Sequence, residues 1–206
     1  MEQQIKSMID KFIEEARVPK KTIAAAMKET GKKAFGCFPI YTPEEIIYSA
    51  GLLPVGMWGG QTSFVHVDKY IQSFCCSLMR ANMELGMKGQ YDFLEGIVIP
   101  TYCDTMKAIL ANWPVAVPSC KAIPLVLPQN RESSGSLDFL IAQLKGFQKE
   151  IETVVGCEIT TEALGEAFDV YEDYRKALRE FTEMVQDYPV TLNPKNRHMI
   201  IKAAWF

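Results

Sequence analysis

The fold is decided by one stretch of the sequence, Gly96-Ile97-Val98-Ile99-Pro100-Thr101-Tyr102-Cys103-Asp104-Thr105. Its apolar run is too short for a helix and rich in β-branched residues, which is typical of a buried parallel strand. Pro100 ends the strand, and Asp104 or Thr105 can cap the helix that follows. The stretch therefore predicts that Cys103 lies in the turn between the carboxyl end of a strand and the amino end of a helix.

The predicted position of Cys103 is one where chemistry is common. Open α/β sheets bind their ligands at the carboxyl ends of the strands. Backbone N–H groups and the helix dipole there favour the thiolate, the form that binds metal or attacks an electrophile. A cysteine in such a turn can equally be an unreactive residue with a packing role only, and this stretch alone leaves both interpretations open.

Strands and helices alternate on both sides of this stretch. Further strands are predicted over 33–38, 52–58 and 122–127, and helices over 43–50, 68–87, 137–155 and 160–186, with terminal helices over 2–17, 21–30 and 194–206. This order implies an α/β fold, a doubly wound parallel sheet with right-handed crossovers and helices on both faces.

The same pattern suggests three parts. We expect an N-terminal helical cap over 1–31, a parallel α/β cluster-binding domain over 32–158, and a helical connection over 159–206 that leads into a second domain. The sequence ends in the apolar residues Ile200, Ile201, Ala203, Ala204, Trp205 and Phe206, and such a run normally packs against further chain. We therefore expect this sequence to be a fragment of a longer protein.

Composition narrows the class of protein. The 206 residues are 48% hydrophobic and carry a formal net charge of −3, which indicates a globular protein without the basic surface of a nucleic-acid binder. No apolar run is long enough to span a membrane, and the N-terminus lacks the apolar segment of a signal peptide. We expect a cytoplasmic protein.

The cysteines point to reduced thiols. Six cysteines without a signal peptide argue against structural disulfides, and the absence of a CxxC pair argues against a zinc ribbon. Cys37 and Cys103 are predicted at carboxyl ends of strands and Cys75 or Cys76 near a helix start, where only one of two adjacent side chains can face a given pocket. Three convergent thiolates can hold one iron–sulfur cluster.

A polar turn follows the predicted fourth strand. Gln129, Asn130 and Arg131 are suited to binding an acyl amide or a phosphate. The alternative is a capped loop that leads into the next helix.

Several motifs, in order along nearly the whole chain, resemble the 2-hydroxyacyl-CoA dehydratase and benzoyl-CoA reductase family. They are Gly36-Cys37-Phe38-Pro39-Ile40-Tyr41-Thr42-Pro43-Glu44-Glu45-Ile46-Ile47, Ala50-Gly51-Leu52-Leu53-Pro54-Val55-Gly56, Phe74-Cys75-Cys76-Ser77-Leu78-Met79, Gly86-Met87-Lys88-Gly89, Ile99-Pro100-Thr101-Tyr102-Cys103-Asp104-Thr105 and Leu127-Pro128-Gln129-Asn130-Arg131. The sequence is most similar to the smaller, C-type or β, subunit of the dehydratases.

This resemblance implies an oxygen-sensitive lyase. In the family a β subunit pairs with a larger α (B-type) subunit, and each holds a 4Fe-4S cluster through three cysteines. A separate ATP-dependent iron–sulfur activator delivers one electron, the 2-hydroxyacyl-CoA substrate becomes a ketyl radical, and water leaves to give a 2-enoyl-CoA.

The resemblance also assigns residues. Cys76 and Cys103 match the first two cluster ligands, Cys75 is the reserve for Cys76, and Cys37 is a further candidate, whereas the third ligand comes from a later domain of full-length relatives.

Thr42 and Glu45 lie beside the end of the first strand and are candidate catalytic groups because of that position, Glu45 as a proton carrier. The alternatives are a subunit of an aromatic acyl-CoA reductase and a non-catalytic dimerising partner without metal.

Overall fold

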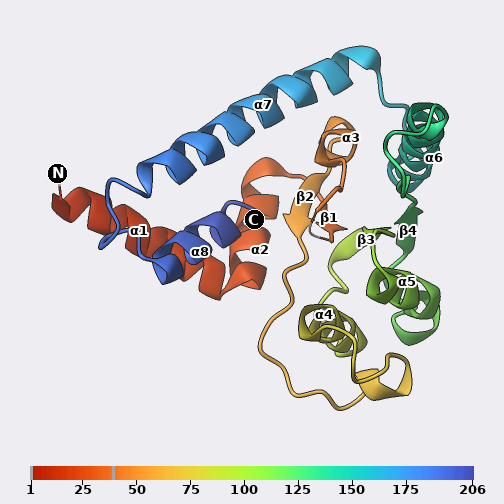
Figure 1. Ribbon diagram of the computed structural model, residues 1–206, viewed down its shortest axis with the longest axis horizontal. Coiled ribbons are helices and arrows are strands. Elements are labelled where there is room, and N and C mark those ends of the chain that lie inside the picture. The colour runs from red at the N-terminus through yellow and green to blue at the C-terminus, as the bar shows by residue number, and fades with distance from the viewer. Residues whose placement is uncertain (1, 39) are drawn as a thin grey trace. The chain divides into compact units, whose positions relative to one another are not determined.

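The computed structural model of the protein describes residues 2–38 and 40–206 (Figure 1). Pro39, which belongs to the first motif above, lies outside the described residues. The chain divides into two compact units, one over Lys33–Ile159 and one formed by the residues up to Lys32 together with Thr160–Phe206. None of the described helices combines the length and the apolarity that crossing a membrane requires.

The unit over Lys33–Ile159 is built on a four-stranded parallel sheet. Its strand order is β2-β1-β3-β4, so β1 and β3 are the central pair. In register, Cys37 of β1 lies between Gly56 of β2 and Val98 of β3. The strands are β1 (Ala34–Cys37), β2 (Leu53–Gly56), β3 (Leu94–Pro100) and β4 (Ala122–Leu125). The predicted parallel α/β fold is confirmed.

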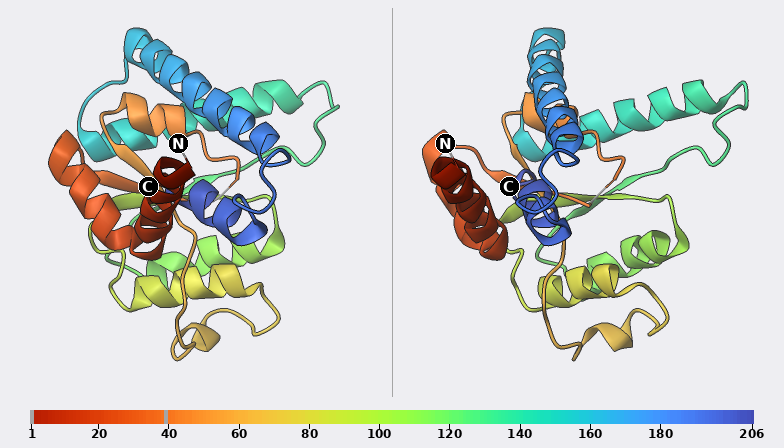
Figure 2. Two further views of the ribbon diagram at one scale, coloured as in Figure 1. Left: turned by 90° about the vertical axis from the view of Figure 1, so that its left-hand side faces the viewer. Right: turned by 60° about the vertical axis from the view of Figure 1, so that its left-hand side comes forward.

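Helices cover both faces of this sheet, as Figures 1 and 2 show. On one face α4 packs against α5, and on the other α3 packs against α6. The four helices are α3 (Glu44–Ser49), α4 (Ser77–Met87), α5 (Asp104–Ala116) and α6 (Ser136–Val155). The chain leaves β1 toward one edge of the sheet and β3 toward the other, so the topological switch point lies between their carboxyl ends.

Trp113 packs in the core between the sheet and α5. Its side chain is fully buried, its indole N–H donates to the carbonyl of Cys120 at 2.9 Å, and the ring of Phe38 packs edge-on against it at 5.9 Å. Burial, together with Asp92, raises the pKa of the Cys120 thiol to about 12. Cys120 is therefore a protonated part of the core.

The prediction of one helix over 68–87 is wrong in its first half. Val67–Lys69 forms a single 3-10 turn, η1, and α4 begins only at Ser77. Phe74, whose spacing with Leu78 suggests a shared apolar face, is 86% exposed. The physical reason is that Arg80 of α4 pairs with Asp68 and donates to the carbonyl of Ser73 at 3.3 Å, contacts that hold this segment outside a helix.

Other boundaries differ by smaller shifts. The helix predicted from residue 43 begins at Glu44, with Pro43 in the cap position, and the Thr42 hydroxyl donates to the carbonyl of Phe38 at 2.8 Å. Pro19 is the first residue of a helix, two residues before the predicted start of that helix. Proline is favoured there because its missing N–H would lack a partner in any case.

The helices predicted at both ends of the chain are present. They are α1 (Glu2–Arg17), α2 (Pro19–Thr30), α7 (Thr161–Met184) and α8 (Pro194–Ala203). Ile200 of the apolar terminal run is buried with Ile9 of α1 and with Leu192. That residues 159–206 lead into a second domain stays a prediction.

A matched pair of glycine substitutions tests the packing of the sheet. A Cβ on Gly36 would lie 2.7 Å from Ile97 Cγ2 and 2.9 Å from Met57 Sδ, whereas one on Gly146, inside α6, would meet nothing within 4 Å. We expect Gly36→Ala to lower the free energy of unfolding by about 1–3 kcal/mol. Gly146→Ala, the control, should raise it by about 0.5–1 kcal/mol, because alanine favours helix. Denaturant unfolding measures both, and equal effects would contradict the packing.

Acid is expected to weaken the fold through Glu84. Burial raises the pKa of this carboxyl, but the N–H groups of His66 and Val67, the Lys88 ammonium and the N–H of Val65 lower it, and the balance leaves it at about 2. The ionised form therefore stabilises the fold fully above the ordinary pKa of 4.5, and this stabilisation is lost as the pH falls toward 2.

The test is urea unfolding of the natural protein and Glu84→Gln at several pH values. At pH 7 the variant should have lost about 2–4 kcal/mol of unfolding free energy, because the loop N–H groups lose a charged acceptor. Its stability should also vary less with pH below 4.5 than that of the natural protein. Two parallel pH profiles would show that Glu84 does not titrate as described.

Candidate functional site

The loop after β1 and the turn after β3 meet at the switch point through two tyrosines. The rings of Tyr41 and Tyr102 pack edge to face with centroids 5.8 Å apart. Ile40 and Tyr41 have φ values of 75° and 64°, a left-handed conformation that is uncommon for residues other than glycine. This backbone turns Tyr41 toward Tyr102, so two segments far apart in the sequence form one rim.

Cys103 lies in the turn between β3 and α5, as predicted. It occupies the N-cap position of α5 in an extended conformation and is half-buried. Asp104, a predicted cap, is instead the first residue of the helix. The cysteine itself therefore lies directly at the amino end of a helix.

Cys76 occupies the equivalent position on α4. It is the N-cap residue of that helix, its carbonyl accepts the N–H of Arg80 at 3.1 Å, and it is exposed. Its neighbour Cys75 is buried. Of this pair, only Cys76 presents its thiol at the surface.

The topology of the sheet places both of these cysteines at one edge. Helix α4 leads from β2 to β3 and α5 from β3 to β4, and all of these strands are parallel, so both helices begin at the carboxyl edge of the sheet. The pKa of Tyr102, at the same edge, is raised first by burial, then by Cys103, Cys76 and Tyr41.

Cys37 differs from this accessible pair in its burial. Its side chain is fully buried at the carboxyl end of β1, and burial, followed by the charge of Glu44, raises its pKa well above that of an ordinary thiol. The described residues contain no group of three or more His, Cys, Asp or Glu side chains that could hold a metal ion. Cys157 is exposed just after α6.

The two candidate catalytic residues lie at the start of α3. Thr42 precedes the helix and is engaged with the carbonyl of Phe38, and Glu45 is only 7% exposed although it lies in the first turn. Glu45 therefore differs from the solvent-exposed acidic residues that are common in the first turn of a helix.

The candidate acyl-CoA residues lie in an exposed loop after β4. The Asn130 side chain accepts the N–H of Glu132 at 2.9 Å, and its carbonyl accepts the hydroxyl of Ser136, the first residue of α6. Asn130 thus supports the loop that leads into α6. Gln129 and Arg131 are on the same loop, and both are exposed.

Sequence reasoning missed Tyr41, and it missed the polar side chains of α4 that hold the loop before Cys76. No signal marks the left-handed backbone at Ile40 and Tyr41, because neither glycine nor asparagine occurs there. Arg80, Glu84 and Lys88 do show a signal, since charges four residues apart share one helix face. That pattern normally indicates a face in solvent, and here it faces a loop.

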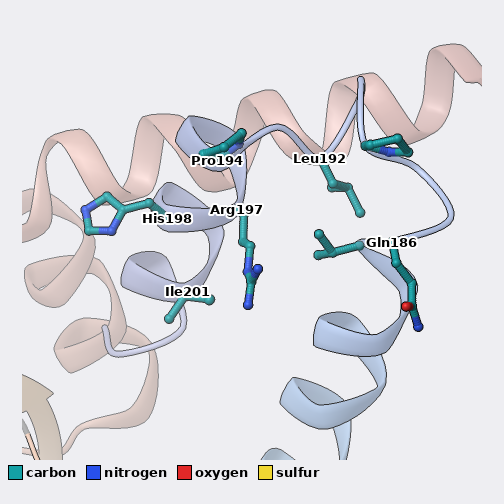
Figure 3. A pocket seen from close by; sticks show the side chains of 8 residues that line it. Gln186, Leu192, Pro194, Arg197, His198 and Ile201 are labelled. Carbon is teal, nitrogen blue, oxygen red and sulfur yellow. The ribbon is translucent and has the colours of Figure 1, made fainter.

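The helical unit contains a hollow of about 510 Å³, which Figure 3 shows. Leu192 and Arg197 point into the space between α8 and the end of α7. None of the predicted site residues lines this hollow. The cysteine pair is therefore a separate feature of the chain.

Comparison with known proteins identifies the family. Residues 39–206 match the family described as 2-hydroxyglutaryl-CoA dehydratase, D-component. The (R)-phenyllactyl-CoA dehydratase beta subunit of Clostridium sporogenes is 37% identical over 188 residues, which are 91% of this chain and 50% of that protein. The lactoyl-CoA dehydratase subunit beta of Anaerotignum propionicum is 34% identical over 203 residues, covering 98% of this chain and 54% of that protein.

A relative with a different name is also similar. A benzoyl-CoA reductase subunit of Thauera aromatica is 28% identical over 186 residues, which are 88% of this chain and 48% of that protein. The chain spans about half the length of the curated relatives it matches. The family match covers most of the chain and agrees with the motifs in the sequence, so the chain belongs to the 2-hydroxyglutaryl-CoA dehydratase D-component family.

Proposed function

We propose that the chain is a β-type subunit of a 2-hydroxyacyl-CoA dehydratase. The reaction removes water from a 2-hydroxyacyl-CoA to give a 2-enoyl-CoA, through a ketyl radical that one electron starts. The observation that carries the proposal is the pair formed by Cys76 and Cys103, two accessible thiols at the amino ends of adjacent helices in a chain of this family. The partners would be a larger α subunit and an ATP-dependent iron–sulfur activator.

The thiol pair fits a 4Fe-4S cluster as part of its ligand set. Cysteine thiolates are the ligands such clusters use, and both cysteines lie at amino ends of helices that begin at the carboxyl edge of the sheet. The described residues offer no third ligand there, so Cys76 and Cys103 would hold one side of the cluster and the rest would come from elsewhere. When bound, the cluster supplies one-electron transfer at low potential.

Aromatic rings and two further cysteines surround the proposed site. The rings of Tyr41 and Tyr102 form a rim at the switch point, where Tyr102 directly precedes Cys103. Cys37 is held protonated inside the core and takes no part, and the buried Cys75 remains the reserve ligand.

The substrate would bind along the same edge of the sheet. Gln129 and Arg131 are the proposed contacts for the amide and phosphate groups of CoA. Asn130, which lies between them, is instead engaged in supporting the loop that carries them. Thr42 and Glu45 follow β1 and are the proposed groups for handling a proton, with Glu45 in a buried setting that suits a proton carrier.

The nearest competing function is reduction of an aromatic acyl-CoA, which the similarity to a benzoyl-CoA reductase protein favours. Turnover of the complete complex with its activator, ATP and a reductant separates the two. We expect a 2-hydroxyacyl-CoA to be converted to a 2-enoyl-CoA while benzoyl-CoA stays unchanged. Consumption of benzoyl-CoA instead would overturn the dehydratase assignment.

Replacement of one thiol tests the metal site. In the complex, purified without oxygen, Cys103→Ala should remove the visible absorption of the cluster in this subunit and lower turnover by more than about 100-fold, because a first ligand is lost. Cys157→Ala, the control, removes an exposed cysteine after α6 and should leave iron content and turnover unchanged. Full cluster content in Cys103→Ala would show that Cys103 is not a ligand.

Iron and sulfide assays address the remaining alternative, a partner subunit that dimerises without metal. A natural complex with iron well below about one equivalent per chain would favour that alternative.

A further inference from the structure

The segment over 57–76, which connects β2 to α4 and ends at Cys76, has little regular structure of its own. Apart from the single turn η1 it contains no helix or strand. Loops of this length keep one conformation only when other parts of the molecule hold them. The contacts that hold this loop come from α4, the helix that it leads into.

Asn82 of α4 holds the start of the loop. Its side chain is fully buried, its Oδ1 accepts the N–H of Gly59 at 3.0 Å and the hydroxyl of Tyr91 at 2.8 Å, and its Nδ2 donates to the carbonyl of Met57 at 3.0 Å. The loop therefore leaves β2 in a fixed direction.

Glu84 and Lys88 hold the middle of the loop. One carboxylate oxygen of Glu84 accepts the N–H groups of Val65, His66 and Val67 at 3.1, 2.9 and 2.9 Å. Lys88 Nζ lies 3.0 Å from the other oxygen and donates to Thr62 Oγ1 and to the carbonyl of Ser63, both at 2.8 Å. Apart from Lys88, all of these partners of the buried carboxylate lie on the loop.

Arg80 holds the part of the loop that approaches the cysteines. Its guanidinium pairs with Asp68, donates to the carbonyl of Ser73 at 3.3 Å, and lies 4.3 Å from the centre of the Phe64 ring. Its backbone N–H donates to the carbonyl of Cys76. Arg80, Asn82, Glu84 and Lys88, which we call the α4 clamp, thus hold the loop from its start to its end.

We propose that the α4 clamp is a set of positioning residues that holds the 57–76 loop so that the Cys76 thiol lies beside Cys103. A buried carboxylate carries a desolvation cost, and here that cost is offset by contacts that fix a loop. The purpose of this placement, which is cluster binding, rests on the proposed function. The placement itself is independent of any metal.

The test uses the metal-free full chain and dibromobimane, a short reagent that bridges two neighbouring thiols. In the natural protein we expect a Cys76–Cys103 bridge, identified by peptide mass spectrometry. Lys88→Met removes the ammonium that joins Glu84 to the loop, and Glu84→Gln removes the charged acceptor. Each should slow bridging by about 10-fold, because the loop that carries Cys76 then spends a smaller fraction of time in the position that bridging requires.

Three controls separate positioning from general unfolding. Lys88→Arg keeps the positive charge and should bridge nearly as fast as the natural protein. Lys121→Met removes a lysine paired with Glu150 at 2.7 Å, away from the loop, and should have no effect. Cys120 is buried and should stay unreacted in the natural protein and in each variant, because its reaction would report loss of the fold.

Three results would decide the matter. If the natural protein bridges and both clamp variants bridge at the same rate, the clamp proposal is overturned while the proposed function stands. If the variants slow bridging but Cys103→Ala keeps its cluster, the clamp proposal stands and the cluster assignment fails. If the natural protein forms no bridge, the two thiols are not neighbours and both proposals fail.

Discussion

The parallel pairing of β1 with β3 is the constraint on which the rest of the α/β unit depends. The chain leaves these two strands toward opposite edges of the sheet, so the segments that follow them begin side by side and then separate. Tyr41 and Tyr102 touch because of this pairing. Cys103 owes its position to the same pairing, since it follows β3 directly.

The second thiol reaches the same place by a different route. Cys76 follows no strand, and its position depends on polar side chains of the helix that it caps. Glu84 is buried and ionised, an arrangement that is stable only because backbone N–H groups and Lys88 surround it. One ligand candidate is thus placed by the sheet and the other by a charge network, so the two should respond differently to acid.

The elements found from the sequence are those that local pattern determines. The β-branched run before Cys103 predicted a buried strand, and proline and glycine marked the helix ends near Pro19 and Gly31 correctly to within a few residues. The helix predicted from residue 68 failed because Phe74 and Leu78 have helical spacing, whereas contacts with Arg80 decide the backbone. Such contacts join residues that are distant in sequence, and no local period reveals them.

The incomplete ligand set has a physical consequence if the proposed cluster binds here. A cluster held by two thiolates from separate segments of this chain needs further ligands, so binding of the cluster and assembly of the site become one equilibrium. Each ligand that is already in place before binding reduces the ordering entropy that the cluster must offset. A chain that fixes Cys76 through α4 and Cys103 through β3 therefore binds more tightly than one whose thiols are mobile, without any additional bond to iron.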